Sequence, residues 1–465
     1  MMRSVALLLL VLATAVQAQD SQRTLRVDYF HSGNAGSEMF SLDRVIREPL
    51  YWPGNPGHPL DTTPRGKYVF RITPEGGSQV QFSRSFSSIY GEWETTGEAR
   101  RINRTFHESV RFPEPDGPFT LSIAKRNAEN GFDEIWRAEL DPSDYLVHEE
   151  APAFAGEVVA IQDNGDPRYK VDLLLLGDGY TAAEHDDFIA RARELTEALF
   201  ATVPFRDRRD DFNVWALAPA ADQSGVSRPS TGIYRDSPFG ASYDAFRSER
   251  YVLTYENAEL RRIASSAPYD AVEILTNSET YGGGGIYGLY STAAANSEWA
   301  DYLFIHEFGH HFAGLADEYY TSSVAYESPD EIREPYEPNV TALLDPAKLK
   351  WRHLVAPETP VPTPWPKEAY ESHSLEYQKT RSDMRASNAP ESEMNALFEQ
   401  NQTIVEALFA DAPHSDVPGA FEGAIYQAKG YYRSEMNCIM FTRTEHFCRV
   451  CAEAINATID ELTGR

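Results

Sequence analysis

Cysteine is scarce in this chain of 465 residues: there are three, and all lie after residue 437. A dense disulfide framework is therefore excluded, because such scaffolds distribute many cysteines along a short chain. Three arrangements remain open for Cys438, Cys448 and Cys451. They form one disulfide and leave one thiol, they stay free, or they join His446 in a structural zinc site.

Basic residues are also few. The chain has 42 lysines and arginines against 71 aspartates and glutamates, which gives a net charge of -29. Nucleic acid is not an expected partner, because phosphate binding requires a basic face. An anionic membrane surface would also repel so acidic a protein.

Long apolar runs are missing beyond the N-terminus, so no membrane-spanning segment is predicted in the mature protein. The first residues, "MMRSVALLLLVLATAVQAQD", carry one basic residue, a short apolar run and the small-residue pattern Val16-Gln17-Ala18. This pattern predicts a signal peptide at residues 1–18 and a secreted protein, periplasmic or extracellular. The alternative is a membrane anchor, for which the apolar run is short.

The chain is too long for one compact core, so two folded domains are expected. Residues 19–150 contain short runs of β-forming residues between turn signals, for example "GKYVFRIT" before "PEGG". This spacing predicts an all-β, sandwich-like domain. Its histidines are scattered, so an accessory or packing role is expected. The composition becomes rich in alanine, proline and glutamate near residue 150, where we place the boundary.

Residues 151–465 alternate predicted strands and helices. The apolar run "VDLLLLG" predicts a buried strand, and Thr181 with Glu184 predicts a capping box for a helix beginning at Ala182. Residues 321–430 have little periodicity and include "PETPVPTPWP", so they are expected to form a long loop insertion.

The glycine run "YGGGG" at 281–285 does not fit a phosphate loop, because no Lys-Ser/Thr pair follows it. It predicts instead a close turn before a short edge strand at 286–292. An edge strand beside a catalytic helix can pair with an extended peptide.

The strongest signal is "HEFGHHFAGLADEYY", which follows a predicted helix. His306 and His310 are four residues apart, so they share one helical face, as two imidazoles must to bind one zinc ion. Glu307 is placed to act as a general base on water. His311 points away from that face and is expected to pack or to support the site.

A catalytic zinc ion needs a third protein ligand. The usual metzincin spacing would place it at Ala316, which cannot ligate. Because Gly314 is also one position later than the metzincin glycine, we expect Asp317 to be the ligand. Glu318 is the nearest alternative. A downstream glutamate (Glu327, Glu331 or Glu334) is a third, although prolines interrupt that stretch.

These motifs, together with "ILTNSETYGGGG" and "FEGAIYQAKGYYRSEMNCIM", resemble the IgA-peptidase family of zinc metallopeptidases. The resemblance implies an α+β zincin-like metallopeptidase domain preceded by the all-β sandwich-like domain. It also implies one catalytic Zn2+ held by His306, His310 and Asp317, with Glu307 as the base. Met440 is then the expected methionine of the turn beneath the metal.

The sequence therefore predicts a secreted zinc endopeptidase that acts on protein or peptide substrates. A tyrosine hydroxyl can assist at the oxyanion, and Tyr319, Tyr320, Tyr431 and Tyr432 are the candidates. Two alternatives stay open: a non-catalytic binding protein with a zincin fold, and a zinc hydrolase of a non-peptide substrate. The natural substrate and the oligomeric state are not predicted.

Overall fold

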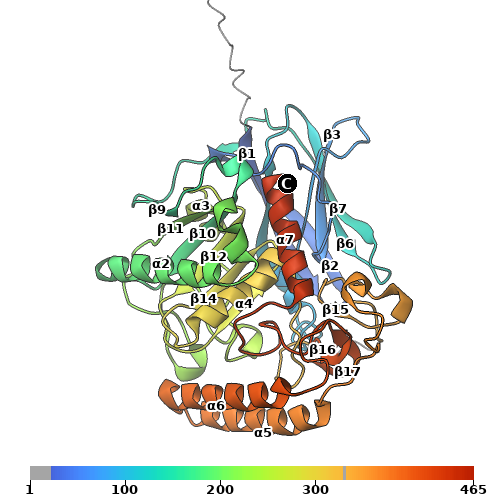
Figure 1. The fold of residues 1–465 in the computed structure, drawn as a ribbon. Helices are drawn as coiled ribbons and strands as arrows, with labels where there is room; N and C mark the ends of the chain where they lie inside the picture. The colour runs from blue at the N-terminus through green and yellow to red at the C-terminus, as the bar shows by residue number, and fades with distance from the viewer. Residues whose placement is uncertain (1–21, 328–330) are drawn as a thin grey trace, which may run out of the picture.

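A computed structural model describes residues 22–327 and 331–465 (Figure 1). The expected signal peptide lies outside the described residues. Within them, no helix is both long and apolar enough to cross a membrane.

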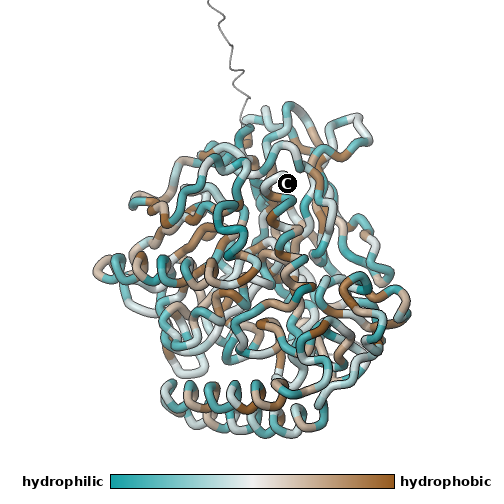
Figure 2. The backbone as a smooth tube through the Cα atoms, viewed as in Figure 1, coloured by the Kyte–Doolittle hydropathy of each residue, from teal (hydrophilic) through white to brown (hydrophobic). Residues whose placement is uncertain are grey.

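The N-terminal strands form two four-stranded sheets that face each other across a common core. Figure 2 shows hydrophobic stretches in the middle of the molecule, and hydrophobic residues alternating with hydrophilic ones along the helices at its edge. The core of this part includes Leu25, Val27, Phe70 and Leu121. The first sheet has the order β5-β1-β2-β8, with β1 (Arg23–Asn34), β2 (Ser37–Tyr51), β5 (Arg104–Pro113) and β8 (His148–Glu149). The second has the order β4-β3-β6-β7, with β3 (Tyr68–Pro74), β4 (Phe82–Phe86), β6 (Phe119–Arg126) and β7 (Phe132–Leu140), and the short helix α1 (Ile89–Trp93) follows β4.

A mixed six-stranded sheet organises the rest of the chain. Strand β10 (Val171–Asp178), the predicted buried strand, lies in its interior and pairs in parallel with both neighbours. Alternate side chains of β10 enter two different cores, Leu173 and Leu175 on one face and Leu174 and Leu176 on the other. This explains its continuous apolar run. The sheet order is β13-β14-β12-β10-β11-β9, with β9 (Val159–Gln162), β11 (Phe212–Leu217), β12 (Ala271–Thr276), β13 (Gly283–Ile286) and β14 (Tyr290–Ala294).

Helices cover both faces of this sheet. The apolar residues of α2 (His185–Ala201), α4 (Ala300–Ala313) and α7 (Arg449–Thr463) share one core, whereas α3 (Asn257–Ala264) contributes to the other. The second core also contains Tyr90 and Trp93 of α1 and Phe106 of β5, so the two parts of the chain pack together. The predicted capping box of Thr181 and Glu184 is present, but one 3-10 turn precedes α2.

The expected loop at 321–430 is wrong in its central part, which forms two antiparallel helices, α5 (Lys367–Ala386) and α6 (Glu391–Ala410), seen along the lower edge of Figure 1. The buried stripe of α5 consists of Tyr370, Ser374, Tyr377 and Arg381. These residues have helical spacing, but none is aliphatic, so the sequence of α5 shows no clear hydrophobic period. A small sheet of β15 (Val340–Thr341), β17 (Gln427–Arg433) and β16 (Phe421–Ala424) flanks the hairpin.

The predicted edge strand at 286–292 also needs correction. The glycines themselves form the edge strand β13, and residues 286–292 contain its last residue, a turn and the start of the interior strand β14. Glycine suits β13 because the strand lies directly on α4. A Cβ on Gly285 would lie 2.3 Å from the carbonyl oxygen of Glu307.

Candidate metal centre and active-site pocket

Helix α4 presents two histidines to a cavity of about 620 Å³. His306 and His310 are one turn apart, and their Nε2 atoms lie 3.2 Å from each other. The helix ends at Gly314, which has a left-handed conformation (φ 61°), as predicted. The N–H of Leu315 donates to the carbonyl of Gly309, and the chain turns back beneath the histidines.

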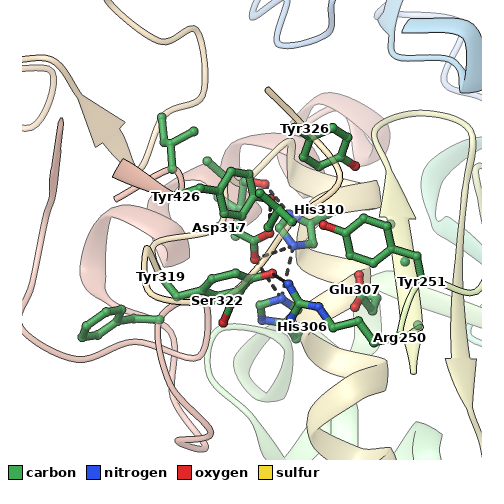
Figure 3. A pocket seen from close by; sticks show the side chains of 18 of the residues that line it. Arg250, Tyr251, His306, Glu307, His310, Asp317, Tyr319, Ser322, Tyr326 and Tyr426 are labelled. Carbon is green, nitrogen blue, oxygen red and sulfur yellow. Dashed lines mark hydrogen bonds and ion pairs between the residues drawn. The ribbon is translucent and has the colours of Figure 1, made fainter. Parts of the chain in front are cut away.

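This turn brings Asp317 to both histidines. Its Oδ1 lies 3.2 Å from Nε2 of His306 and 3.2 Å from Nε2 of His310 (Figure 3). Oδ1 is buried and accepts no well-directed hydrogen bond. Burial would raise the pKa of Asp317, but the two histidines hold it well below its usual range. The same contact raises the pKa of His310 to about 9, against the effect of burial.

The three atoms match the donor set of a tetrahedral zinc site. Nitrogen and oxygen ligands at about 2.0–2.1 Å from zinc are separated by about 3.3 Å at the tetrahedral angle. The observed separations are all 3.2 Å. The residues present therefore fit a zinc ion with three protein ligands and one open position, the arrangement of catalytic rather than structural sites.

Both histidines are oriented by hydrogen bonds from their other ring nitrogen. Nδ1 of His306 donates to the carbonyl oxygen of Ile439 at 2.9 Å, and Nδ1 of His310 donates to that of Leu315 at 2.6 Å. In a neutral imidazole these bonds hold the single proton on Nδ1, so Nε2 would be the atom that binds a metal. Met440, the residue after Ile439, is buried under α4. A Cβ on Gly309 would lie 3.2 Å from the sulfur of Met440. Met440 thus occupies the place expected for the methionine of the turn.

Glu307 lies in the cavity wall between α4 and β13 (Figure 3). A Cβ on Gly283 would approach its Oε1 to 3.2 Å, so the strand glycines leave room for this carboxylate. Burial raises the pKa of Glu307. A carboxylate with a raised pKa is better matched to exchanging protons near neutral pH.

Tyrosines form much of the cavity wall, and sequence reasoning missed most of them. Of the four candidates named above, only Tyr319 lines the cavity. Its hydroxyl accepts a hydrogen bond from Arg250 Nη2 at 3.0 Å. Tyr251, Tyr326 and Tyr426 also line it. Of these three, only Tyr426 lies in a motif quoted above. A single tyrosine gives no signal in a sequence that contains 25 tyrosines.

Tyr426 sits in a strained hairpin turn against the site. Its hydroxyl donates to Oδ2 of Asp317 at 2.5 Å. Ile425 and Tyr426 form the two-residue turn between β16 and β17, with φ of 48° and 61°. Two-residue turns of this kind favour Asn-Gly, because a positive φ is energetically unfavourable for most other residues. Backbone bonds from both residues to the carbonyls of Asp317 and Tyr319 hold the turn in place.

The other proposed ligands lie elsewhere. Glu327 pairs with Arg100, Glu331 with Arg333, and Glu334 with Lys350. Glu318 points away from the histidines and contacts the cysteines. His311 is buried on another face of α4, where its Nδ1 donates to Ile286 and its Nε2 accepts from Val272. It joins α4 to the sheet, as its expected packing role requires.

The N-terminal part of the chain also contributes to the cavity, although sequence reasoning found no chemistry there. Lys67 and Glu92 line it, and burial raises the pKa of Glu92. The N–H of Glu327 donates to the carbonyl of Thr95, which connects the loop after α4 to this part of the chain.

Comparison with known proteins identifies the family of the chain. The family model described as IgA Peptidase M64 matches residues 159–459, and the model of the peptidase M64 N-terminus matches residues 17–137. The expected boundary at 150 falls between the two matches. No curated protein gives a significant match. The two models together cover most of the sequence, from its β-rich sheets to the last helix, and the chain therefore belongs to the IgA peptidase M64 family and is a peptidase.

Proposed function

We propose that this peptidase is a zinc-dependent endopeptidase with a zincin-like catalytic domain. The observation that carries the proposal is the triangle of Nε2 of His306, Nε2 of His310 and Oδ1 of Asp317, with every side 3.2 Å. Its dimensions suit one zinc ion, and the carboxylate of Glu307 lies on the same helix beside it.

A bound zinc ion would polarise the scissile carbonyl and lower the pKa of a water molecule towards neutrality. Glu307 then accepts the proton of the attacking water on its carboxylate and delivers it to the departing amine. The raised pKa of Glu307 favours this transfer, because the carboxylate can hold the proton between the two steps. His306, His310 and Asp317 keep their positions throughout, since each is fixed by a hydrogen bond on its outer side.

Tyr319 is the proposed hydrogen-bond donor to the oxyanion. Because Arg250 is the donor in their mutual hydrogen bond, the Tyr319 hydroxyl retains its own proton for an acceptor in the cavity. Burial raises its pKa well above the usual value, so the hydroxyl remains protonated. This is the requirement for a neutral donor facing developing negative charge.

The edge strand β13 supports an extended peptide as the substrate. The backbone N–H of Gly283 donates to the carbonyl of Arg250, and its carbonyl accepts from the N–H of Val252. Both bonds point away from the neighbouring strand β14. Residues two apart point the same way in a strand, so the polar groups of Gly285 face outward too. Gly285 lines the cavity next to Glu307 and His310. A substrate backbone paired at Gly285 would pass in front of the base.

Secretion is a further part of the proposal and rests on the sequence of residues 1–18. If the segment is a signal peptide, N-terminal sequencing of the exported protein begins at Gln19. A mature protein that begins at Met1 would contradict it.

The experiment that tests the catalytic proposal is Glu307→Gln. Glutamine cannot accept the proton, so casein cleavage falls by about 10²-fold or more while zinc content is unchanged. The exposed residue Glu358 gives the matched control, Glu358→Gln, which retains both. Full activity of the purified Glu307→Gln protein would refute the mechanism. Wild-type protein that binds zinc but cleaves no protein or peptide would favour the non-catalytic alternative.

A further inference from the structure

The three cysteines of the chain gather with Glu318 in the interior. Cys438 follows β17, Cys448 caps the N-terminus of α7, Cys451 lies in its first turn, and Glu318 belongs to the loop after α4. Each of the four residues is at least 99% buried. No disulfide joins the cysteines. His446, the partner considered from the sequence, is outside the cluster and contacts Thr444.

The distances within the cluster are those of a tetrahedral site with sulfur and oxygen ligands. Ligand sulfurs at about 2.3 Å from zinc lie about 3.8 Å apart, and an oxygen at about 2.0 Å lies about 3.5 Å from each sulfur. The Sγ atoms of Cys438 and Cys451 are 3.8 Å apart. Oε1 of Glu318 is 3.6 Å from Sγ of Cys451 and 4.0 Å from that of Cys448.

The surroundings are built to stabilise thiolates and a bound carboxylate. Backbone N–H groups of Cys448 and Cys451 approach Sγ of Cys438 and Cys448 at 3.2 and 3.4 Å. Ser434 Oγ contacts Sγ of Cys448 at 3.1 Å. Asn339 donates to Oε1 of Glu318 at 2.9 Å. Such outer contacts orient metal ligands and tune their basicity.

Two observations point to a cation at the centre. Oε2 of Glu318 is buried without a hydrogen-bond partner, which is costly for a carboxylate unless a cation compensates it. The nearby buried cation, Arg433, directs its hydrogen bonds to the carbonyls of Glu422, Gly423 and Met436 instead. Three soft thiolates make the cluster unsuited to magnesium or calcium, and zinc accepts both thiolate sulfur and carboxylate oxygen.

We propose that Glu318, Cys438, Cys448 and Cys451 bind a second, structural zinc ion. All four positions are taken by protein, and all are buried, which is the character of a structural rather than a catalytic site. The ion connects the loop after α4, the segment before Met440 and the start of α7. Ligands Glu318 and Cys438 directly adjoin Asp317 and Ile439, so this site fixes the backbone that positions the candidate catalytic centre.

The first test uses the wild-type protein, purified without chelators or reductants. Metal analysis gives two zinc ions per chain, and denaturation with a chelator releases three free thiols. A content of one zinc ion per chain would overturn the proposal. So would a mass of the denatured protein two daltons below that of the fully reduced chain, which would indicate a Cys438–Cys451 disulfide.

The second test separates the two centres. A His306→Ala/His310→Ala variant retains one zinc ion, and its cobalt-substituted form shows a sulfur-to-cobalt charge-transfer band in the near ultraviolet. Absence of that band in folded protein would overturn the proposal. Glu318→Gln weakens zinc binding in this background about 10- to 100-fold. Glu273→Gln is the control, because Glu273 is a fully buried glutamate of β12 that contacts Ser291 and not the cluster. Equal affinities in the two variants would exclude Glu318 as a ligand.

Discussion

The backbone N–H of Glu318 donates a hydrogen bond to the carbonyl oxygen of Met440, 2.8 Å away. The bond joins two segments more than a hundred residues apart in sequence. The residue before Glu318 is Asp317, and the residue before Met440 is Ile439, whose carbonyl orients His306. One backbone contact therefore couples the position of the carboxylate at the centre to the orientation of a histidine.

Replacing Asp317 tests the third ligand. Asp317→Ala removes the oxygen that lies 3.2 Å from both histidines, so zinc content falls by one equivalent and peptidase activity is lost. Metal analysis and casein cleavage measure both effects, with the exposed Asp236→Ala as control. Retention of that zinc equivalent in the Asp317→Ala protein would place the third ligand elsewhere.

Two tyrosine variants separate metal binding from catalysis. Tyr426→Phe removes the hydrogen bond to Asp317 Oδ2, so zinc affinity falls about 10- to 100-fold. Tyr319→Phe removes a donor that faces the cavity, so kcat falls about 10²-fold at saturating zinc with zinc affinity unchanged. Chelator competition gives the affinities, and steady-state kinetics give kcat. A Tyr319→Phe protein with wild-type kcat would assign the oxyanion donor to another group.

Gly285→Ala tests the contact of β13 with α4. The added Cβ would lie 2.3 Å from the Glu307 carbonyl oxygen and 2.8 Å from Cβ of His310. The strand must move away, which costs about 1–3 kcal/mol in the free energy of unfolding and displaces the edge strand from Glu307. Urea unfolding and cleavage kinetics report the two effects. Gly117→Ala, where nothing lies within 4 Å, is the control and changes neither.

The buried pair Asp172 and Asp270 predicts a pH dependence of stability. Burial, and for Asp172 the charge of Asp270, raise their pKa values to about 7 and about 6, so the pair titrates as a unit. The folded state thus binds more protons than the unfolded state between about pH 4 and pH 7, and stability falls as pH rises through that window.

Asp172→Asn removes part of this dependence while its amide oxygen still accepts from Trp215 Nε1. We expect the variant to lose less stability than wild type between pH 5 and pH 8, with a difference on the order of 2 kcal/mol. Urea unfolding with excess zinc measures it. Parallel stability curves for the two proteins would show that the pair does not contribute.

Local sequence predicted the parts of the fold that local rules govern. The continuous apolar run at 171–177 predicts the buried strand β10 correctly, and the run is continuous because both faces of β10 are covered. The spacing of His306 and His310 predicted a shared helical face, and Gly314 predicted the left-handed helix end. Helix α5 is not predicted, since its buried stripe is built from tyrosine, serine and arginine. The stripe of α6, which includes Met394 and Phe398, does have an apolar helical period, so composition does not explain why the prediction of a loop is wrong there.

By itself, therefore, the sequence determined the helix with its two histidines, the glutamate between them, and the glycine that turns Asp317 back. These features depend on contacts within about ten residues, where helical geometry is decisive. Tertiary structure alone decided that Asp317 meets the histidines while Glu318 meets the cysteines, although the two residues are neighbours. It also decided that Arg250 and Tyr426 reach the cavity. Those outcomes depend on the packing of segments from distant parts of the chain, whose relative placement no local pattern encodes.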